Sequence, residues 1–142
     1  MLVETVLYLF FYRKLIEKSD FLIFVISCVL VIFLLFELYF KNLVDDFFSF
    51  TLTIKSLSFI VLSLYYFYQV YTKEKDIFKN EAPQFWYNVG ILIYFSLAFF
   101  PFLLATEMMS GLFDYSLWFV HNIGNFSKNI IFAVGLWMVQ KR

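Results

Sequence analysis

The sequence predicts an all-α, polytopic transmembrane helix bundle, and its composition and hydropathy pattern are the observations behind this prediction. Hydrophobic residues make up 63% of the 142 residues and charged residues only 15%. Ordinary soluble domains have about 45–50% and about 25%. A soluble chain of this size could not bury so much apolar surface, so we expect the surplus to face lipid. The length allows a single integral membrane domain, residues 1–142.

The first segment is an apolar N-terminal helix, residues 1–12, with the basic residues Arg13 and Lys14 directly after it. Twelve helical residues extend only about 18 Å, against a hydrocarbon core of about 30 Å. The positive charge follows the apolar run, whereas a signal peptide carries it in front. Two interpretations stay open, an interfacial helix along the membrane or the end of a longer spanning helix. Apolar residues surround this helix, which favours the second interpretation or a buried contact.

Four longer apolar runs predict four membrane spans, at about residues 20–40, 47–71, 85–108 and 116–139. The second run is rich in serine and threonine, whose hydroxyls commonly bond to their own helix or to a neighbouring one. The third contains Pro101, which should kink the helix or loosen its hydrogen bonding. Short polar segments separate the runs, and the most hydrophilic is residues 72–84.

Lysine and arginine outside these spans predict the orientation of the chain. Lys41 is alone on one side, and the other side carries eight residues: Arg13, Lys14, Lys18, Lys73, Lys75, Lys79, Lys141 and Arg142. The positive-inside rule therefore places residues 13–19, residues 72–84 and the C-terminus in the cytoplasm. We expect a multi-pass protein of the cell inner (cytoplasmic) membrane.

Polar residues within or beside the spans are the candidate site, because ionisable groups at membrane depth are costly and often functional. Estimated depths pair Glu37 with Lys55 and Glu107 with His121. Lys128 lies near the midplane, where a lysine costs about 2.5–3.5 kcal/mol. We expect it to snorkel or to meet a partner in a neighbouring copy. The candidates are His121, Asn122, Asn125, Lys128, Glu37, Lys55, Glu107 and Asp114.

The fourth run also predicts how its helix is rotated. At about 100° per residue, Asp114, Asn125 and Lys128 lie close to the direction of His121. Gly124 and Gly135 share that side, and the other side carries Phe119, Ile123, Phe126, Ile130 and Val134. We expect the polar and small-residue stripe to face inward, where glycines permit close helix contact.

Two roles remain open for this stripe. Its side chains could hold the helices together through interhelical hydrogen bonds, or His121 could titrate in a pocket that senses protons or a ligand. No catalytic constellation, cofactor motif or basic nucleic-acid patch is evident. Cys28, the single cysteine, offers neither an internal disulfide nor a metal motif. We therefore predict a protein that is not an enzyme and has no cofactor.

The pattern of residues 65–135 rests on the segments Phe85-Trp86, Gly90–Ser96, Leu117-Trp118, His121–Ile123, Lys128–Ile130 and Phe132-Ala133. It resembles a group of small, uncharacterised bacterial membrane proteins that are sometimes encoded beside sensor histidine kinases. Many members are longer at the N-terminus, which would suit residues 1–12 being the end of a further helix. The resemblance implies a membrane accessory to signalling.

Two functions follow as hypotheses. The first is a non-enzymatic sensory or scaffolding accessory that acts through helix–helix contacts. Its partners would be membrane lipid and either further copies of the chain or a membrane-embedded signalling protein, without nucleic acid. The alternative is a subunit of a small oligomeric transporter or channel built around the stripe of the fourth span.

Overall fold

The computed structural model describes residues 2–16, 20–40, 46–72, 82–105 and 116–140. Within these ranges, the structure does not describe the side chains of residues 2, 20, 22, 34, 37, 38, 40, 46–49, 82, 117 and 140. All regular structure in the described residues is helical, which confirms the predicted all-α class. The helices are α1 (Leu2–Leu15), α2 (Asp20–Phe40), α3 (Asp46–Thr72), α5 (Ala82–Leu103) and α7 (Ser116–Gln140).

The first described residues of the helices are of types that favour helix N-termini. Asp20, Asp46 and Ser116 open α2, α3 and α7, and aspartate and serine are favoured at helix N-termini because their side chains can accept bonds from free backbone N–H groups. Pro83 is the second residue of α5, where its missing N–H costs nothing. At the other end, α5 runs through the buried Pro101 and ends at Leu103.

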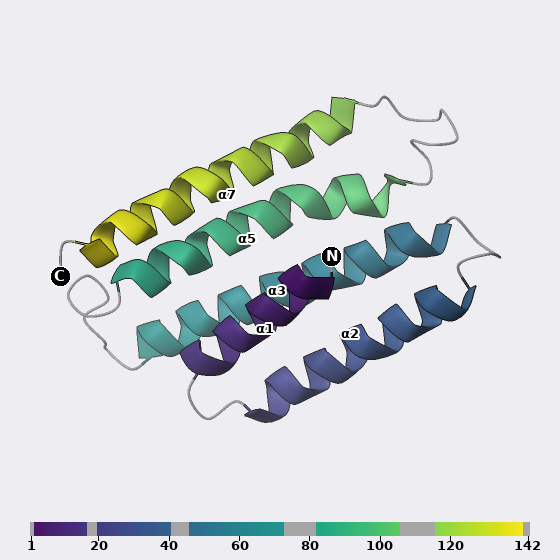
Figure 1. Cartoon of the computed structure of the whole chain (residues 1–142), viewed down its shortest axis with the longest axis horizontal. Coiled ribbons are helices and arrows are strands. Elements are labelled where there is room, and N and C mark those ends of the chain that lie inside the picture. Colours follow the sequence, from purple (N-terminus) through teal and green to yellow (C-terminus); the bar gives the residue numbers. More distant parts are fainter. Residues whose placement is uncertain (1, 17–19, 41–45, 73–81, 106–115, 141–142) are drawn as a thin grey trace.

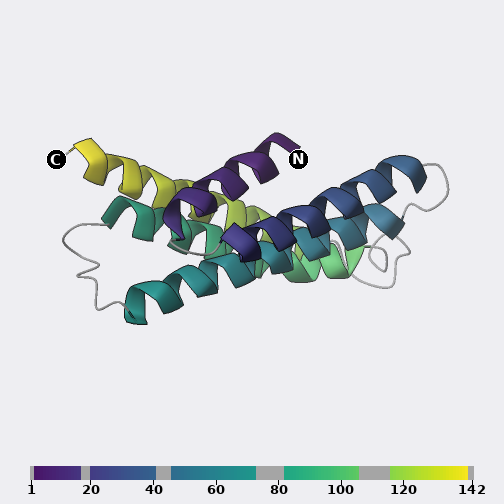
Figure 2. The same ribbon diagram turned by 90° about the horizontal axis from the view of Figure 1, so that it is seen from below.

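The four longer helices run side by side in chain order, each next to its sequence neighbour, and α1 lies over α3 (Figures 1 and 2). The main packing pairs are α2 with α3, α3 with α5, and α5 with α7. Short connections between consecutive helices favour this up-and-down order. As a result, α7 is at one edge of the row, with α5 as its main neighbour among the described helices.

Two described helical segments are long and apolar enough to cross a membrane, Phe50–Thr72 in α3 and Pro83–Leu103 in α5. The sequence predicted four spans. Two of the four, those in α3 and α5, are long and apolar enough within the described residues. In α2, the described apolar segment is shorter and runs over Ile23–Phe33. α7 has 25 residues, which is enough to span, but its histidine, lysine and asparagines lower its hydropathy.

Aromatic rings from three helices form the centre of the core. Phe59 of α3 stacks on Phe95 of α5 with centroids 4.9 Å apart, and Tyr8 of α1 meets both rings edge-on at 5.4 and 5.8 Å. Tyr12, one turn further along α1, is completely buried. Edge-on and offset-stacked rings are the favoured aromatic geometries. α1 therefore makes a buried contact with the bundle, which is one of the arrangements expected for residues 1–12.

Glycines set the close approach of α5 and α7. A Cβ atom on Gly124 would lie 3.1 Å from Cβ of Leu97, and one on Gly135 would lie 2.9 Å from the Tyr87 ring. Both glycines are buried, in agreement with the inward direction predicted for them. Small residues at such positions let two backbones pack closely, which is the main source of contact between helices in lipid.

This packing predicts the effect of enlarging Gly124. Gly124→Leu should lower the free energy of unfolding by about 1–3 kcal/mol, because the new side chain must push α7 away from α5. The free energy would be measured by denaturant titration of the purified protein in detergent. Ala133→Leu, at an exposed position of the same helix, is the matched control and should change it little. Equal effects of the two substitutions would show that α5 and α7 do not pack through Gly124.

Candidate functional site

The charged side chains inside the described bundle meet at Glu4 of α1. Its Oε2 accepts a hydrogen bond from Nζ of Lys55 on α3 at 2.9 Å, and its Oε1 lies 3.7 Å from Nζ of Lys128 on α7. One carboxylate thus contacts ammonium groups from two helices that are not adjacent in the row. We call Glu4, Lys55 and Lys128 the Glu4 cluster.

The surroundings of the Glu4 cluster are mostly apolar and aromatic. The side chains of Lys55 and Lys128 are 7% and 11% exposed, and that of Glu4 is 34% exposed. Nζ of Lys128 is 4.0 Å from the centroid of the Tyr94 ring, a cation–π distance. Buried ammonium groups without a counter-charge are very costly, so Glu4 offsets the desolvation of both lysines.

The spacing of residues along α1 brings Glu4 to this position. Glu4, Tyr8 and Tyr12 are four residues apart, so they follow one face of the helix. Tyr8 and Tyr12 enter the aromatic core, and this directs the Glu4 side chain toward α3 and α7. The same face therefore carries one ion-pairing group and two aromatic anchors.

A second polar contact joins α1 to α3 and α5 through Tyr12, two helical turns after Glu4. The hydroxyl of Tyr12 donates to Oδ1 of Asn88 at 2.8 Å and also contacts Oγ of Ser63. Nδ2 of Asn88 donates to the backbone carbonyl of Ser63 at 3.2 Å. All three residues are buried. Because the phenol proton is used toward Asn88, Ser63 is the donor to Tyr12, and the three side chains satisfy one another.

His121 lies among aromatic rings, and one of these, Tyr94, also contacts Lys128 of the Glu4 cluster. Its ring centroid is 5.1 Å from that of Phe102, 5.6 Å from Tyr94 and 5.8 Å from Trp118. Its Nδ1 atom is buried and has no hydrogen-bond partner in the described part of the chain. Glu107, its expected partner, is in residues 106–115, outside the described residues.

The structure brings together only part of the predicted site. Lys55 and Lys128 both reach Glu4, so Lys128 meets its counter-charge within the chain. The partner expected for Lys55 was Glu37, whose side chain lies outside the description, as does Asp114. The predicted inward direction is wrong for Asn125, which is exposed together with Asn122. The side of α7 that is buried is narrower than expected, because α5 is the main neighbour of α7 among the described helices.

Sequence reasoning missed Glu4, Tyr12 and Asn88. The first two lie in a segment too short to span a membrane, and Asn88 is one amide within a long apolar run. A usable signal was present, because Glu4 is the single acidic residue in the apolar segment 1–12. Two lysines within apolar spans need an acidic partner that also lies in an apolar segment, and Glu4 is such a residue.

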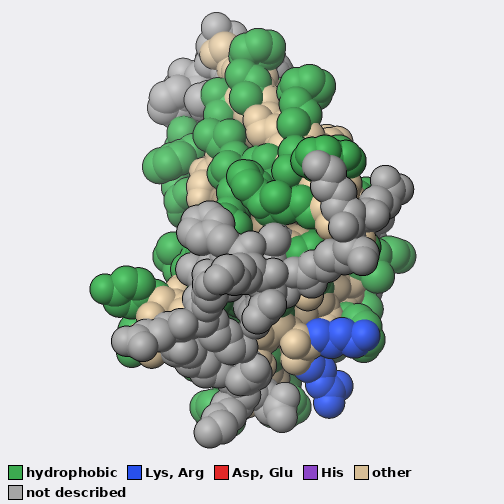
Figure 3. Space-filling model, turned by 90° about the vertical axis from the view of Figure 1, so that its left-hand side faces the viewer, with side chains coloured by type: hydrophobic (Ala, Val, Ile, Leu, Met, Phe, Trp, Pro, Cys, Tyr) green, Lys and Arg blue, Asp and Glu red, His purple; other side chains and the backbone are tan. Residues whose placement is uncertain are grey.

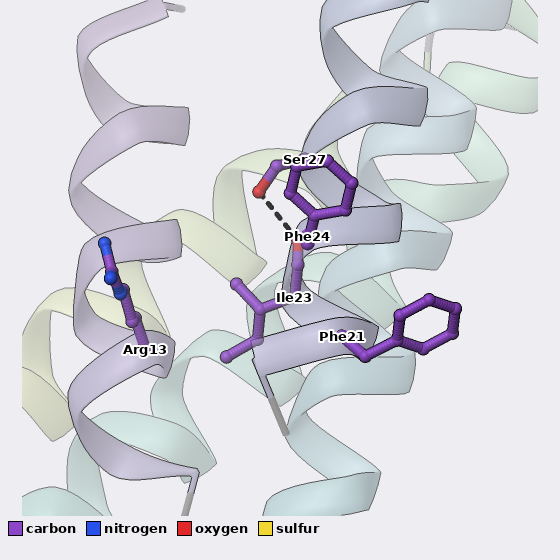
Figure 4. Close-up of a pocket in the computed structure, with 5 residues that line it drawn as sticks. All are labelled: Arg13, Phe21, Ile23, Phe24 and Ser27. Carbon is purple, nitrogen blue, oxygen red and sulfur yellow. Dashed lines mark hydrogen bonds between the residues drawn. The ribbon is translucent and has the colours of Figure 1, made fainter. Parts of the chain in front are cut away.

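A cavity of about 500 Å³ opens between α1 and α2 (Figure 4). Arg13 of α1 forms one wall, and the other wall is α2, through Phe21, Ile23, Phe24 and Ser27. The hydroxyl of Ser27 donates to the backbone carbonyl of Ile23 at 2.7 Å, so its proton is already used. Among the described residues that line this cavity, one cation faces an apolar wall, and this set provides no acid–base pair for catalysis.

Metal chemistry and known relatives add no further constraint. Among the described residues, no three histidine, cysteine, aspartate or glutamate side chains gather into a group that could hold a metal ion. Comparison of the chain with family models, curated proteins and solved structures found no match. The candidate site is therefore interpreted from its own geometry.

The two lysines of the Glu4 cluster should differ in their contributions to stability. Lys55→Met should lower the free energy of unfolding on the order of 2 kcal/mol, because it removes the hydrogen-bonded partner of Glu4. Lys128→Met should change it by less than about 1 kcal/mol, since it removes a buried charge and leaves the closer pair intact. Denaturant titration in detergent measures both, with the exposed Lys14→Met as control. A larger loss for Lys128→Met would contradict the assigned geometry.

Proposed function

We propose that the protein is a non-enzymatic, multi-pass membrane component, a sensory or scaffolding accessory that acts through helix–helix contacts. The Glu4 cluster is the observation that carries this proposal. Its ionisable groups contact one another and fasten α1 to α3 and α7. Lys128, in contact with Glu4 and the Tyr94 ring, is placed for packing, and this favours an accessory over a transport pathway.

The exposed apolar surface supports a membrane location beyond the two candidate spans. Large hydrophobic side chains such as Phe24 of α2, Leu64 of α3 and Phe126 of α7 are more than half exposed. Figure 3 shows apolar side chains over much of the described surface on the face that it presents. Exposed apolar area on this scale, spread over several helices, is what a lipid-facing surface requires. We propose that α2 and α7 also cross the membrane, giving four spans.

The arrangement of helix ends supports the proposed orientation. The ends of α1, α3 and α7 and the start of α5 lie at the same end of the bundle (Figure 1). In the sequence, the basic segments after residues 12, 72 and 140 adjoin these ends. We propose that this end faces the cytoplasm of a bacterial cell, as the positive-inside rule requires.

In this proposal α1 is the element that passes a signal. It contacts α3 and α5 through the aromatic core and α3 and α7 through Glu4. A displacement of α1 would break both ion pairs together and leave two buried lysines without counter-charge. A partner that contacts α1 or the outer helices could therefore shift the packing of the whole bundle.

Copurification tests this proposal. Tagged protein extracted from membranes in a mild detergent should elute as a complex that contains a second membrane protein or further copies of the chain. Size measurement and mass spectrometry identify the contents. Glu4→Gln should reduce the recovered complex because it loosens α1, whereas Lys14→Gln, an exposed change on the same helix, should not.

Two results would refute the proposal. One is recovery of the protein from the soluble fraction, and the other is a strictly monomeric, partner-free protein in the membrane fraction. Full recovery of the complex with Glu4→Gln would keep the membrane assignment but remove α1 as the coupling element.

A further inference from the structure

Three asparagines follow one flank of α7. Asn122, Asn125 and Asn129 are all exposed, and at about 100° per residue they fall within about 60° of one another. Their spacing of three and then four residues is that of the contact positions of a coiled coil. Leu136, seven residues after Asn129, continues the line and is 60% exposed.

This flank is unfavourable in lipid. Each asparagine side chain carries two N–H donors and a carbonyl acceptor, and none of the three has a hydrogen-bond partner among the described residues. In the hydrocarbon region water cannot replace the missing partner, so each unpaired amide is costly. Counted from Ser116, the three lie about 9 to 20 Å along the axis of α7, well inside the proposed span.

The described helices leave this flank exposed. α7 is at the edge of the row (Figure 1), and α5 meets its other side through Gly124 and Gly135. Lys128 turns toward Glu4 on that inner side. The asparagine flank carries no charge, so a partner with ionic side chains would leave its own charges unpaired there.

The chemistry of the amide identifies the partner. An asparagine both donates and accepts, so identical asparagines can satisfy each other across a two-fold axis. Two copies inserted with the same topology have parallel α7 helices, which places each asparagine beside its own counterpart. Buried asparagines at such contact positions are known to specify register and a two-stranded state.

We propose that α7 packs against α7 of a second copy through Asn122, Asn125, Asn129 and Leu136, forming a parallel two-fold dimer in the membrane. This proposal rests on the proposed membrane location. It identifies a second copy of the chain as the partner at the asparagine flank of α7. None of the dimer's four contact residues belongs to the Glu4 cluster.

Cysteine cross-linking within membranes tests this dimer. Cys28→Ser removes the single native cysteine, and single cysteines are then placed at residues 122, 125 and 129. Each substitution is at an exposed position, and each retains two of the three asparagines. Oxidation should give a covalent dimer of twice the monomer mass at all three positions. Ile123→Cys and Ile130→Cys, exposed on the opposite flank of α7, are the matched controls and should give several-fold less.

The outcomes separate the dimer from the proposed function. Equal cross-linking at all five positions, or stronger cross-linking at residues 123 and 130, would overturn the asparagine interface. An adduct of a different mass at residues 122, 125 and 129 would identify a heterologous partner, which overturns the second copy and leaves the proposed function standing. As a second measurement, Asn125→Leu should shift the parent protein toward monomer in detergent, and an unchanged dimer fraction would also count against the proposal.

Discussion

The pairing of Glu4 with Lys55 and Lys128 is the interaction on which the rest of the structure depends. Two lysines sit among aromatic rings with almost no exposure, and such groups are tolerated inside a bundle only with a counter-charge. That counter-charge comes from α1, which crosses over α3 in the bundle. The position of α1 and the burial of Lys55 and Lys128 therefore depend on each other.

Close packing of the helices brings the three charged side chains together. Gly124 and Gly135 let α7 approach α5 closely, and the Phe59–Phe95 stack joins α3 to α5. α1 then lies over the aromatic surface that these contacts create, with Tyr8 inserted edge-on. Neither contact is ionic, yet together they bring Lys55 and Lys128 within reach of one carboxylate. Close packing and charge neutralisation are thus achieved by the same helices.

The sequence predicts the helices well because apolar run length and polar boundaries are local properties. The bounds of α2 and α7 agree with the runs 20–40 and 116–139 within a residue, and the inward side of Gly124 follows from helical periodicity. The partner of Lys55 could not be predicted, because it depends on which helix lies over α3, and that is decided by tertiary packing. Asn125 was misplaced for a related reason: periodicity defines a polar face but does not show how many neighbours cover it.

The unfolding free energy of a charge-swapped pair tests the central claim most directly. Glu4→Lys alone places three ammonium groups together and should lower this free energy by about 3–5 kcal/mol, the cost of breaking a buried pair. Adding Lys55→Glu restores a carboxylate between two lysines, and most of the loss should be recovered. If the double variant is no more stable than Glu4→Lys alone, the Glu4 cluster does not hold α1 in place.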